Sequence, residues 1–275
     1  MMSLWDENNV RYQLISTQGN CSKSFNWLFF PGGPGIDSSY FSTLTNHLTL
    51  PGNVWYIDFP NNGSNVIKEK DIQNFDAWLE MFMPIIAKFK NPIYVGHSFS
   101  AMLPLLYPEL EEKLSGLVLL SSAPCLWFEA SAQRAKQKGL PDVSGVLTEY
   151  MQNPNQETFW KANEAFAHYY FTPKFFQEGW ALLEKTPVNP YGPFWWMPKV
   201  QTLNYSAKWI PQKVPTLIIG GAEDAVTPFS LFQHDERFHR SNIALHEISN
   251  VAHFPWMGAL EEVKNLFSVF IRNVL

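Results

Sequence analysis

The sequence is poor in charged residues and in cysteine, and it has neither a basic cluster nor a long apolar run. Charged residues make up 16% of its 275 residues, and the formal net charge is −5. Proteins that bind nucleic acid carry a basic face, so the lack of a lysine or arginine block predicts no nucleic-acid partner. The chain also lacks a run of the ~18 apolar residues that cross a bilayer, which predicts no membrane span.

The two cysteines and the N-terminal residues indicate in which cellular compartment the protein is expected. Cys21 and Cys125 are too few for a disulfide framework, and we interpret them as unpaired thiols in a reducing cytosol. The chain does not start with a basic segment followed by an apolar one, the pattern of a signal peptide. We therefore expect a cytoplasmic protein. No cysteine–histidine cluster suggests a metal site, and we expect neither a metal nor another cofactor.

Apolar segments of two kinds alternate along the chain. Hydrophobic residues make up 46% of the sequence, and the length suits one large domain or a core domain with an insertion. Short apolar runs predict strands over Val10–Ser16, Trp27–Phe30, Val54–Phe59, Pro92–Val95, Leu117–Leu120, Thr216–Ile219 and Ala244–Ile248. Helical periodicity predicts helices over Phe75–Phe89, Phe99–Leu110, Pro228–Phe238 and Leu260–Leu275.

This alternation is typical of an α/β protein with a mostly parallel central sheet flanked by helices. Such sheets place their functional residues at the carboxyl ends of the strands. We expect residues 1–125 and 211–275 to form this core domain.

The stretch 126–210 interrupts the alternation and predicts only helices. Asn153-Pro154 and Thr172-Pro173 are typical helix starts. Phe159, Asn163, Phe166 and Tyr170 share one helical face. An aromatic-rich run follows at 191–196. We interpret 126–210 as a helical cap (lid) over an active site, because apolar side chains line most substrate pockets. The alternative is a helical subdomain whose aromatics only pack a core.

The run Gly96-His97-Ser98-Phe99-Ser100 lies between a predicted strand and a predicted helix. A serine hydroxyl needs exposure and a neighbouring base to act as a nucleophile, and a sharp strand-to-helix turn provides the exposure. Ser98 is the candidate nucleophile. We interpret His97 as a packing residue, since neighbouring side chains on a strand point to opposite faces.

Three further segments follow predicted strands and complement this serine. The loop 31–35 (Pro-Gly-Gly-Pro-Gly) exposes backbone N–H groups that can bind an oxyanion, or is a plain turn. Glu223 and Asp224 are candidate acids, and Asp224 has the better spacing to Gly221 and Pro228; both can also cap the next helix. His253 follows the last predicted strand and is the candidate base.

The order nucleophile, acid, histidine is that of α/β-hydrolase triads, and nearly the whole chain resembles an α/β-hydrolase with a helical cap. The loop 31–35 resembles the His-Gly-Gly-Pro-Gly loop of the proline iminopeptidase-like branch. The resemblance implies Ser98 as nucleophile, Asp224 as acid and His253 as base. It also implies the backbone N–H groups of Gly33 and Phe99 as the oxyanion hole.

The chain departs from the branch at three places. Pro31 replaces the histidine of the loop, and Ser100 replaces a glycine. Residues 58–65 lie where the branch has Asp-x-Arg-Gly-x-Gly-x-Ser, but only Asp58 and Gly63 match and the arginine is absent. These changes leave the triad residues in place, but they weaken the match to the peptidase branch.

The predicted chemistry is acyl transfer from a small-molecule substrate to water. One candidate function is hydrolysis of a small ester or amide with an apolar acyl group. Another is an aminopeptidase, which needs a carboxylate for the substrate ammonium, with cap candidates Glu149, Glu157, Glu164 and Glu178. His168 is either a packing residue of the cap or a substrate contact. A third is a non-catalytic ligand-binding protein of the same fold. The sequence leaves the oligomeric state open.

Overall fold

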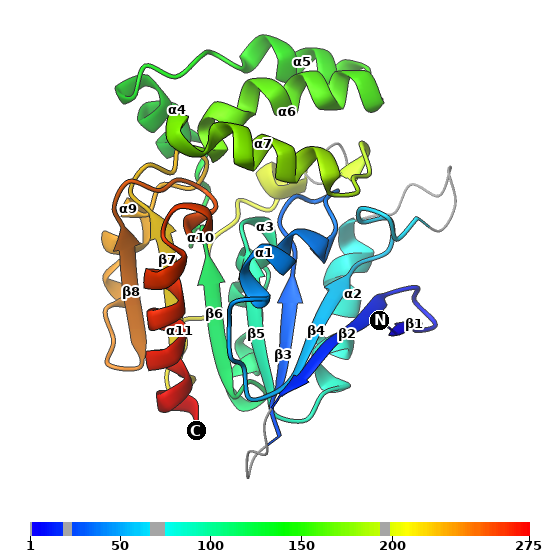
Figure 1. Ribbon diagram of the computed structural model, residues 1–275, viewed down its shortest axis with the longest axis vertical. Helices are drawn as coiled ribbons and strands as arrows, with labels where there is room; N and C mark the ends of the chain where they lie inside the picture. Colours follow the sequence, from blue (N-terminus) through cyan, green and yellow to red (C-terminus); the bar gives the residue numbers. More distant parts are fainter. Residues whose placement is uncertain (1, 19–23, 67–74, 193–198) are drawn as a thin grey trace.

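The computed structural model describes residues 2–18, 24–66, 75–192 and 199–275, and its centre is an eight-stranded sheet (Figure 1). The strand order is β1-β2-β4-β3-β5-β6-β7-β8; β3 to β8 run parallel to one another, and β2 is antiparallel to both of its neighbours, β1 and β4. The strands are β1 Met2–Trp5, β2 Arg11–Gln18, β3 Asn26–Phe30, β4 Gly52–Asp58, β5 Pro92–His97, β6 Gly116–Leu120, β7 Thr216–Gly221 and β8 Ile243–Ile248. The predicted mostly parallel sheet is confirmed.

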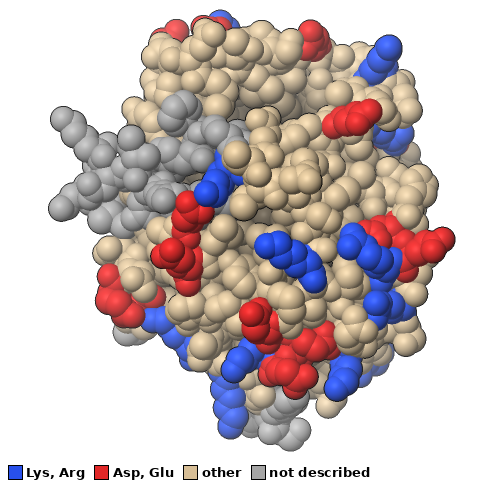
Figure 2. Space-filling view, turned by 180° about the vertical axis from the view of Figure 1, so that it is seen from behind, with Lys and Arg blue, Asp and Glu red and all other residues tan. Residues whose placement is uncertain are grey.

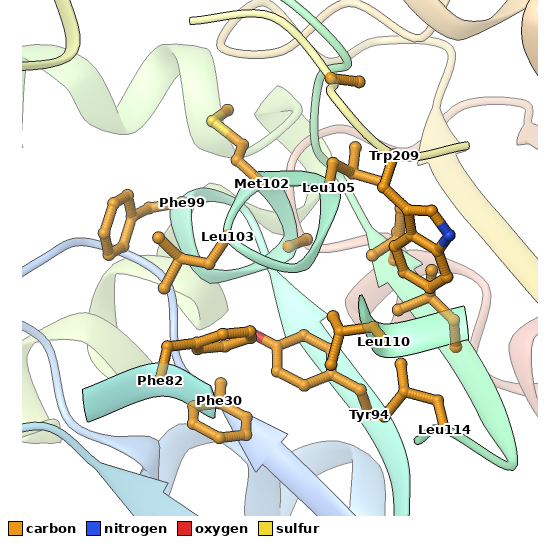
Figure 3. Packing of buried hydrophobic residues seen from close by; sticks show 14 of the residues in the cluster. Phe30, Phe82, Tyr94, Phe99, Met102, Leu103, Leu105, Leu110, Leu114 and Trp209 are labelled. Carbon is orange, nitrogen blue, oxygen red and sulfur yellow. The ribbon is translucent and has the colours of Figure 1, made fainter. Parts of the chain in front are cut away.

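Helices cover both faces of this sheet. On one face, α2 (Phe75–Ala87) packs against the sheet through Phe82, whose ring lies 5.6 Å from that of Tyr94 on β5, and Tyr94 in turn stacks on Phe30 of β3 (Figure 3). On the other face, Phe267 of α11 (Leu260–Val274) packs against Trp27 of β3. Both faces of the sheet are thus buried, which explains why the central strands are continuous apolar runs in the sequence.

Shorter helices connect these elements. They are η1 Ser38–Phe41, α1 Ser42–Thr45, α3 Phe99–Met102, η2 Pro104–Leu106, η3 Pro108–Glu112, α9 Ser230–Gln233, η5 Glu236–Phe238 and α10 Pro255–Gly258. The predicted helix 99–110 is therefore wrong beyond Met102, because Pro104 and Pro108 have no N–H to continue the α-helix. The predicted helix 228–238 is likewise only the short α9 and η5.

The stretch between β6 and β7 contains helices that lie over the carboxyl ends of the strands (Figure 1). They are α4 Phe128–Gln137, α5 Ser144–Gln152, α6 Gln156–Tyr170, η4 Pro173–Phe175 and α7 Phe176–Lys185. The chain leaves and re-enters the core at one place, where Cys125 and Ser206 form an isolated β-bridge. From this contact we propose that 126–210 is the cap and that 1–125 and 211–275 are the core domain.

The start of α6 differs from the prediction. Its N-cap is Asn155, whose side chain accepts from the N–H groups of Glu157 and Thr158, so Pro154 precedes the helix instead of opening it. Thr172 does cap η4. Cys21 and residues 193–196 of the aromatic-rich run lie outside the described residues.

The surface is mixed in charge. Lys and Arg are interspersed with Asp and Glu on the face shown in Figure 2. Within the described ranges, no helix has the length and apolar character needed to cross a membrane.

Candidate active site

Ser98 forms the apex of the turn between β5 and α3. Its φ of 55° lies in the left-handed region, a strained conformation for a residue with a Cβ that is typical of a nucleophile turn. Its N–H donates to the carbonyl oxygen of Leu120 at 2.8 Å, which fixes the turn to β6. Gly96 is needed here, because a Cβ at that position would lie 2.7 Å from the Cα of Ala101. The side chain of Ser98 is left half-buried.

The structure brings the three predicted residues together. The Nε2 atom of His253 lies 2.9 Å from the Oγ atom of Ser98, and its Nδ1 atom lies 2.8 Å from Oδ2 of Asp224. The loops that follow β5, β7 and β8 carry these residues, at the same edge of the sheet. This arrangement matches a serine, a base and an orienting carboxylate.

Asp224 is held so that its carboxylate faces the histidine. Oδ1 accepts from the N–H groups of Val226 and Thr227, and Oδ2 accepts from Oγ1 of Thr227 and faces Nδ1 of His253. Its neighbour Glu223 instead forms an ion pair with Lys138 at the end of α4. Of the two acids that the sequence allows, the structure therefore places Asp224 beside the imidazole.

The backbone of His253 is also fixed on both sides. Its N–H donates to the carbonyl oxygen of Tyr170, the last residue of α6, at 3.1 Å. Its carbonyl oxygen lies 2.9 Å from Nε2 of His97. The cap and β5 thus both contact the candidate base.

His97 does more than pack. Its ring is 1% exposed, and its Nδ1 atom lies 2.9 Å from the hydroxyl of Tyr40. Burial, with a smaller contribution from the nearby His253, holds the pKa of His97 well below its usual value. The interpretation of His97 as a packing residue missed these hydrogen bonds, because Tyr40 is far from it in the sequence and no local pattern marks the contact.

The glycine loop after β3 lies against the serine. A Cβ on Gly32 would lie 3.1 Å from Cβ of Ser98, so a larger residue there would crowd the serine. The N–H of Gly32 donates to the hydroxyl of Tyr40 at 2.7 Å, and that of Gly35 donates to Asn62, which leaves Gly33 as the candidate oxyanion donor of this loop. Gly33 has a φ of 106° and lines the same cavity as Ser98 and Phe99.

A buried ionic cluster supports the segment that follows this loop. Arg11 on β2 donates to Asp58 through Nε at 3.2 Å and Nη2 at 2.8 Å, and its Nη2 lies 3.3 Å from Asp37. Asp58 also accepts from the N–H and the hydroxyl of Ser38. Burial raises the pKa of Asp58 to about 6, and the Arg11 charge opposes this.

Arg11 supplies a guanidinium next to Asp58 from outside the segment 58–65. Residues 58–65 share Asp58 with the peptidase branch but contain no arginine. A guanidinium nevertheless reaches Asp58, from a strand 47 residues earlier. A lone arginine in an alternating strand gives no local signal of this role.

The candidate site opens into a cavity of about 580 Å³ between the core and the cap. The α6 residues Phe159, Asn163, Phe166 and Tyr170 all line it, as the helical pattern predicts. Further apolar lining comes from Met102, Trp127, Phe128, Val143, Leu147, Met151, Trp160, Leu183, Val188, Val226 and Phe254. The aromatic face of α6 thus faces the serine.

None of the four cap glutamates faces this cavity. Glu149, Glu157, Glu164 and Glu178 are exposed, and Glu149 pairs with Lys161. Among the described lining residues the only carboxylate is that of Asp142, an exposed side chain whose Oδ1 accepts from the N–H of Ser144 at the start of α5. His168 lies outside the lining, where it is exposed and stacks on Phe176.

Metal ligands are not clustered in the part of the chain that the structure describes. No group of three His, Cys, Asp or Glu side chains there is placed to hold an ion.

The strand order and the loops after β5, β7 and β8 define an α/β-hydrolase fold. A model of the alpha/beta hydrolase family matches residues 27–265, and the chain belongs to this family. No curated protein matches the sequence.

Solved structures share this fold. The proline iminopeptidase-related protein of Thermus thermophilus superposes with a TM-score of 0.72 at 18% identity, covering 100% of this chain and 99% of that one. The proline iminopeptidase of Mycobacterium smegmatis gives 0.62 at 18% identity over 96% and 95% of the chains. An esterase of Exiguobacterium antarcticum gives 0.65 at 15% identity, also over 96% and 95%. At these identities the likeness concerns the fold.

Proposed function

We propose that the protein is a serine hydrolase that cleaves a small carboxylic ester or amide with an apolar acyl group. The observation that carries the proposal is the line of contacts from Ser98 through His253 to Asp224 at the floor of an apolar cavity. The reaction forms an acyl-enzyme on Ser98 and then hydrolyses it.

The hydrogen bonds of His253 support a specific order of proton transfers. Nδ1–H of His253 donates to the carboxylate of Asp224, so the lone pair of Nε2 faces the hydroxyl of Ser98. As Oγ attacks the carbonyl carbon, its proton passes to Nε2, and Asp224 stabilises the imidazolium. The same proton then goes to the leaving oxygen or nitrogen as its bond to the acyl carbon breaks. A water molecule repeats both steps on the acyl-enzyme.

The developing negative charge on the carbonyl oxygen requires donors. We assign the N–H groups of Gly33 and Phe99, two residues that line the cavity together with Ser98. The loss of one such donor typically lowers kcat by about 10² to 10³.

The lining of the cavity favours an apolar acyl group over a charged amine. An aminopeptidase needs an anionic partner for the substrate ammonium, and the described lining residues offer only one carboxylate, the exposed Asp142, which already accepts from the N–H of Ser144. An apolar chain, in contrast, gains about 0.8 kcal/mol for each methylene it buries. This corresponds to about a fourfold rise in kcat/KM per methylene while the chain still fits.

Turnover of p-nitrophenyl acetate, butyrate and octanoate, compared with a prolyl arylamide, tests the proposal. We expect kcat/KM to rise with acyl length and the arylamide to be a poor substrate. The variant Leu147→Trp, which narrows the cavity at α5, should lower the activity on octanoate more than on acetate. Efficient prolyl arylamide turnover that is lost in Asp142→Asn would instead establish the aminopeptidase. No turnover of any substrate would favour a ligand-binding protein.

A further inference from the structure

One continuous chain of hydrogen bonds runs behind the candidate nucleophile. It begins at the N–H of Gly32, 2.7 Å from the hydroxyl of Tyr40. This hydroxyl lies 2.9 Å from Nδ1 of His97, and Nε2 of His97 lies 2.9 Å from the carbonyl oxygen of His253. The chain therefore joins the glycine loop after β3 to the histidine loop after β8, through the residue that precedes Ser98.

The directions of the two end bonds in this hydrogen-bond chain follow from chemistry. A carbonyl oxygen only accepts, so Nε2 of His97 must carry the proton that it shares with His253. A backbone N–H only donates, so the oxygen of Tyr40 accepts from Gly32. In a neutral His97 ring Nδ1 has no proton, and it accepts the hydroxyl proton of Tyr40. The network thus fits neutral His97 with the proton on Nε2.

Aromatic packing leaves this chain little room to adjust. The ring of Tyr40 stacks on Trp256 at 6.3 Å, and the ring of His97 lies 4.7 Å from that of Phe254 and 5.1 Å from that of Trp256. Both Tyr40 and His97 are 1% exposed, so the chain of hydrogen bonds is made within the protein. Burial also holds the pKa of His97 well below its usual value, in agreement with the neutral ring.

We propose that His97 and Tyr40 are positioning residues, which set the distance between the oxyanion loop and the catalytic base. This inference rests on the proposed function, and it gives His97 a role in addition to packing. Gly32 adjoins the proposed donor Gly33, and the carbonyl group of His253 fixes the backbone that carries the base. A displacement of about 1 Å between such groups can cost about 10² in rate.

Conservative variants test the two ends of this hydrogen-bond chain separately. Tyr40→Phe keeps the ring and removes the hydroxyl on which Gly32 and His97 meet. His97→Gln places an amide nitrogen near the position of Nε2 and can still donate to His253, whereas His97→Ala removes both bonds. Tyr12→Phe is the matched control, because Tyr12 is a buried tyrosine on β2 whose hydroxyl donates to Asp6, away from the site.

The measurements are kcat and KM for p-nitrophenyl butyrate and the rate and stoichiometry of labelling by a fluorophosphonate. We expect Tyr40→Phe and His97→Ala to lower kcat and the labelling rate by about 10- to 100-fold, with KM changed less than about threefold. Labelling should still reach one per chain, which shows that the variants are folded. His97→Gln should recover part of the loss, and Tyr12→Phe should match the wild type.

Two results would overturn the inference. One is a kcat unchanged in Tyr40→Phe and His97→Ala. The other is a loss that appears only as a smaller labelled fraction, which a purely structural role would produce. If Tyr40→Phe does not fold, the comparison of His97→Gln with His97→Ala decides. Failure of the proposed function is a separate outcome: the wild type itself would then neither turn over the ester nor be labelled.

Discussion

The Oδ2 atom of Asp224 lies 2.8 Å from the Nδ1 atom of His253, while the adjacent Glu223 forms an ion pair with Lys138. We therefore expect Asp224→Asn to lower kcat by about 10⁴, because the amide favours the wrong tautomer of the imidazole. Glu223→Gln should change kcat by less than about threefold, since it loses only a partly exposed ion pair. Steady-state kinetics on one ester compare the two. A large loss in Glu223→Gln with little in Asp224→Asn would show that the acid is assigned wrongly.

Ser100 should not be replaceable by the glycine of the α/β-hydrolase motif without a cost in stability. Its hydroxyl donates to the carbonyl oxygen of Phe30 at 2.6 Å and accepts from the N–H of His97 at 3.1 Å. Ser100→Gly leaves both backbone groups buried without this partner, which costs about 1–3 kcal/mol each before relaxation. We expect a clear drop in Tm and in the free energy of unfolding. Equal or higher stability of Ser100→Gly in urea unfolding would contradict this role.

The buried His97 should make the stability of the protein depend on pH. The unfolded imidazole takes up a proton near pH 6.5, whereas burial holds the pKa of His97 in the fold well below that. The unfolded state thus binds more protons as the pH falls below about 6.5, and the fold loses up to about 1.4 kcal/mol per pH unit from this group. His97→Gln should reduce the loss between about pH 7 and pH 5. Urea unfolding at several pH values measures it, and an unchanged slope would count against a buried neutral His97.

Local patterns were enough to predict the sheet and to select the three candidate residues, because each depends on short-range signals. The apolar runs gave the six parallel strands and β2, and Ser98, Asp224 and His253 each lie in the turn or loop that follows one of them. The edge strand β1 (Met2–Trp5) was missed, since Leu4 and Trp5 are exposed and show no buried face. The prolines after Met102 were visible signals that the longer helix prediction disregarded.

The contacts that hold the site together were not predictable in the same way. Arg11 reaches Asp58, and Tyr40 reaches His97, across 47 and 57 residues of sequence. Such pairs depend on the order of the strands, which no local periodicity reveals. The same holds for the cap: the helical pattern gave the face of α6 that lines the cavity, but only the packing of the helices shows that the four cap glutamates lie on the outside.

The central claim is that His253 activates Ser98 for attack on an acyl substrate, and covalent labelling tests it most directly. A fluorophosphonate probe, with the adduct located by mass spectrometry, should modify Ser98 in the wild type and in Ser131→Ala, a change at another serine of the cavity lining. It should not label Ser98→Ala, and it should label His253→Ala more slowly by at least about 10³. Labelling of Ser98→Ala at the wild-type rate, or no labelling of the wild type, would contradict the account.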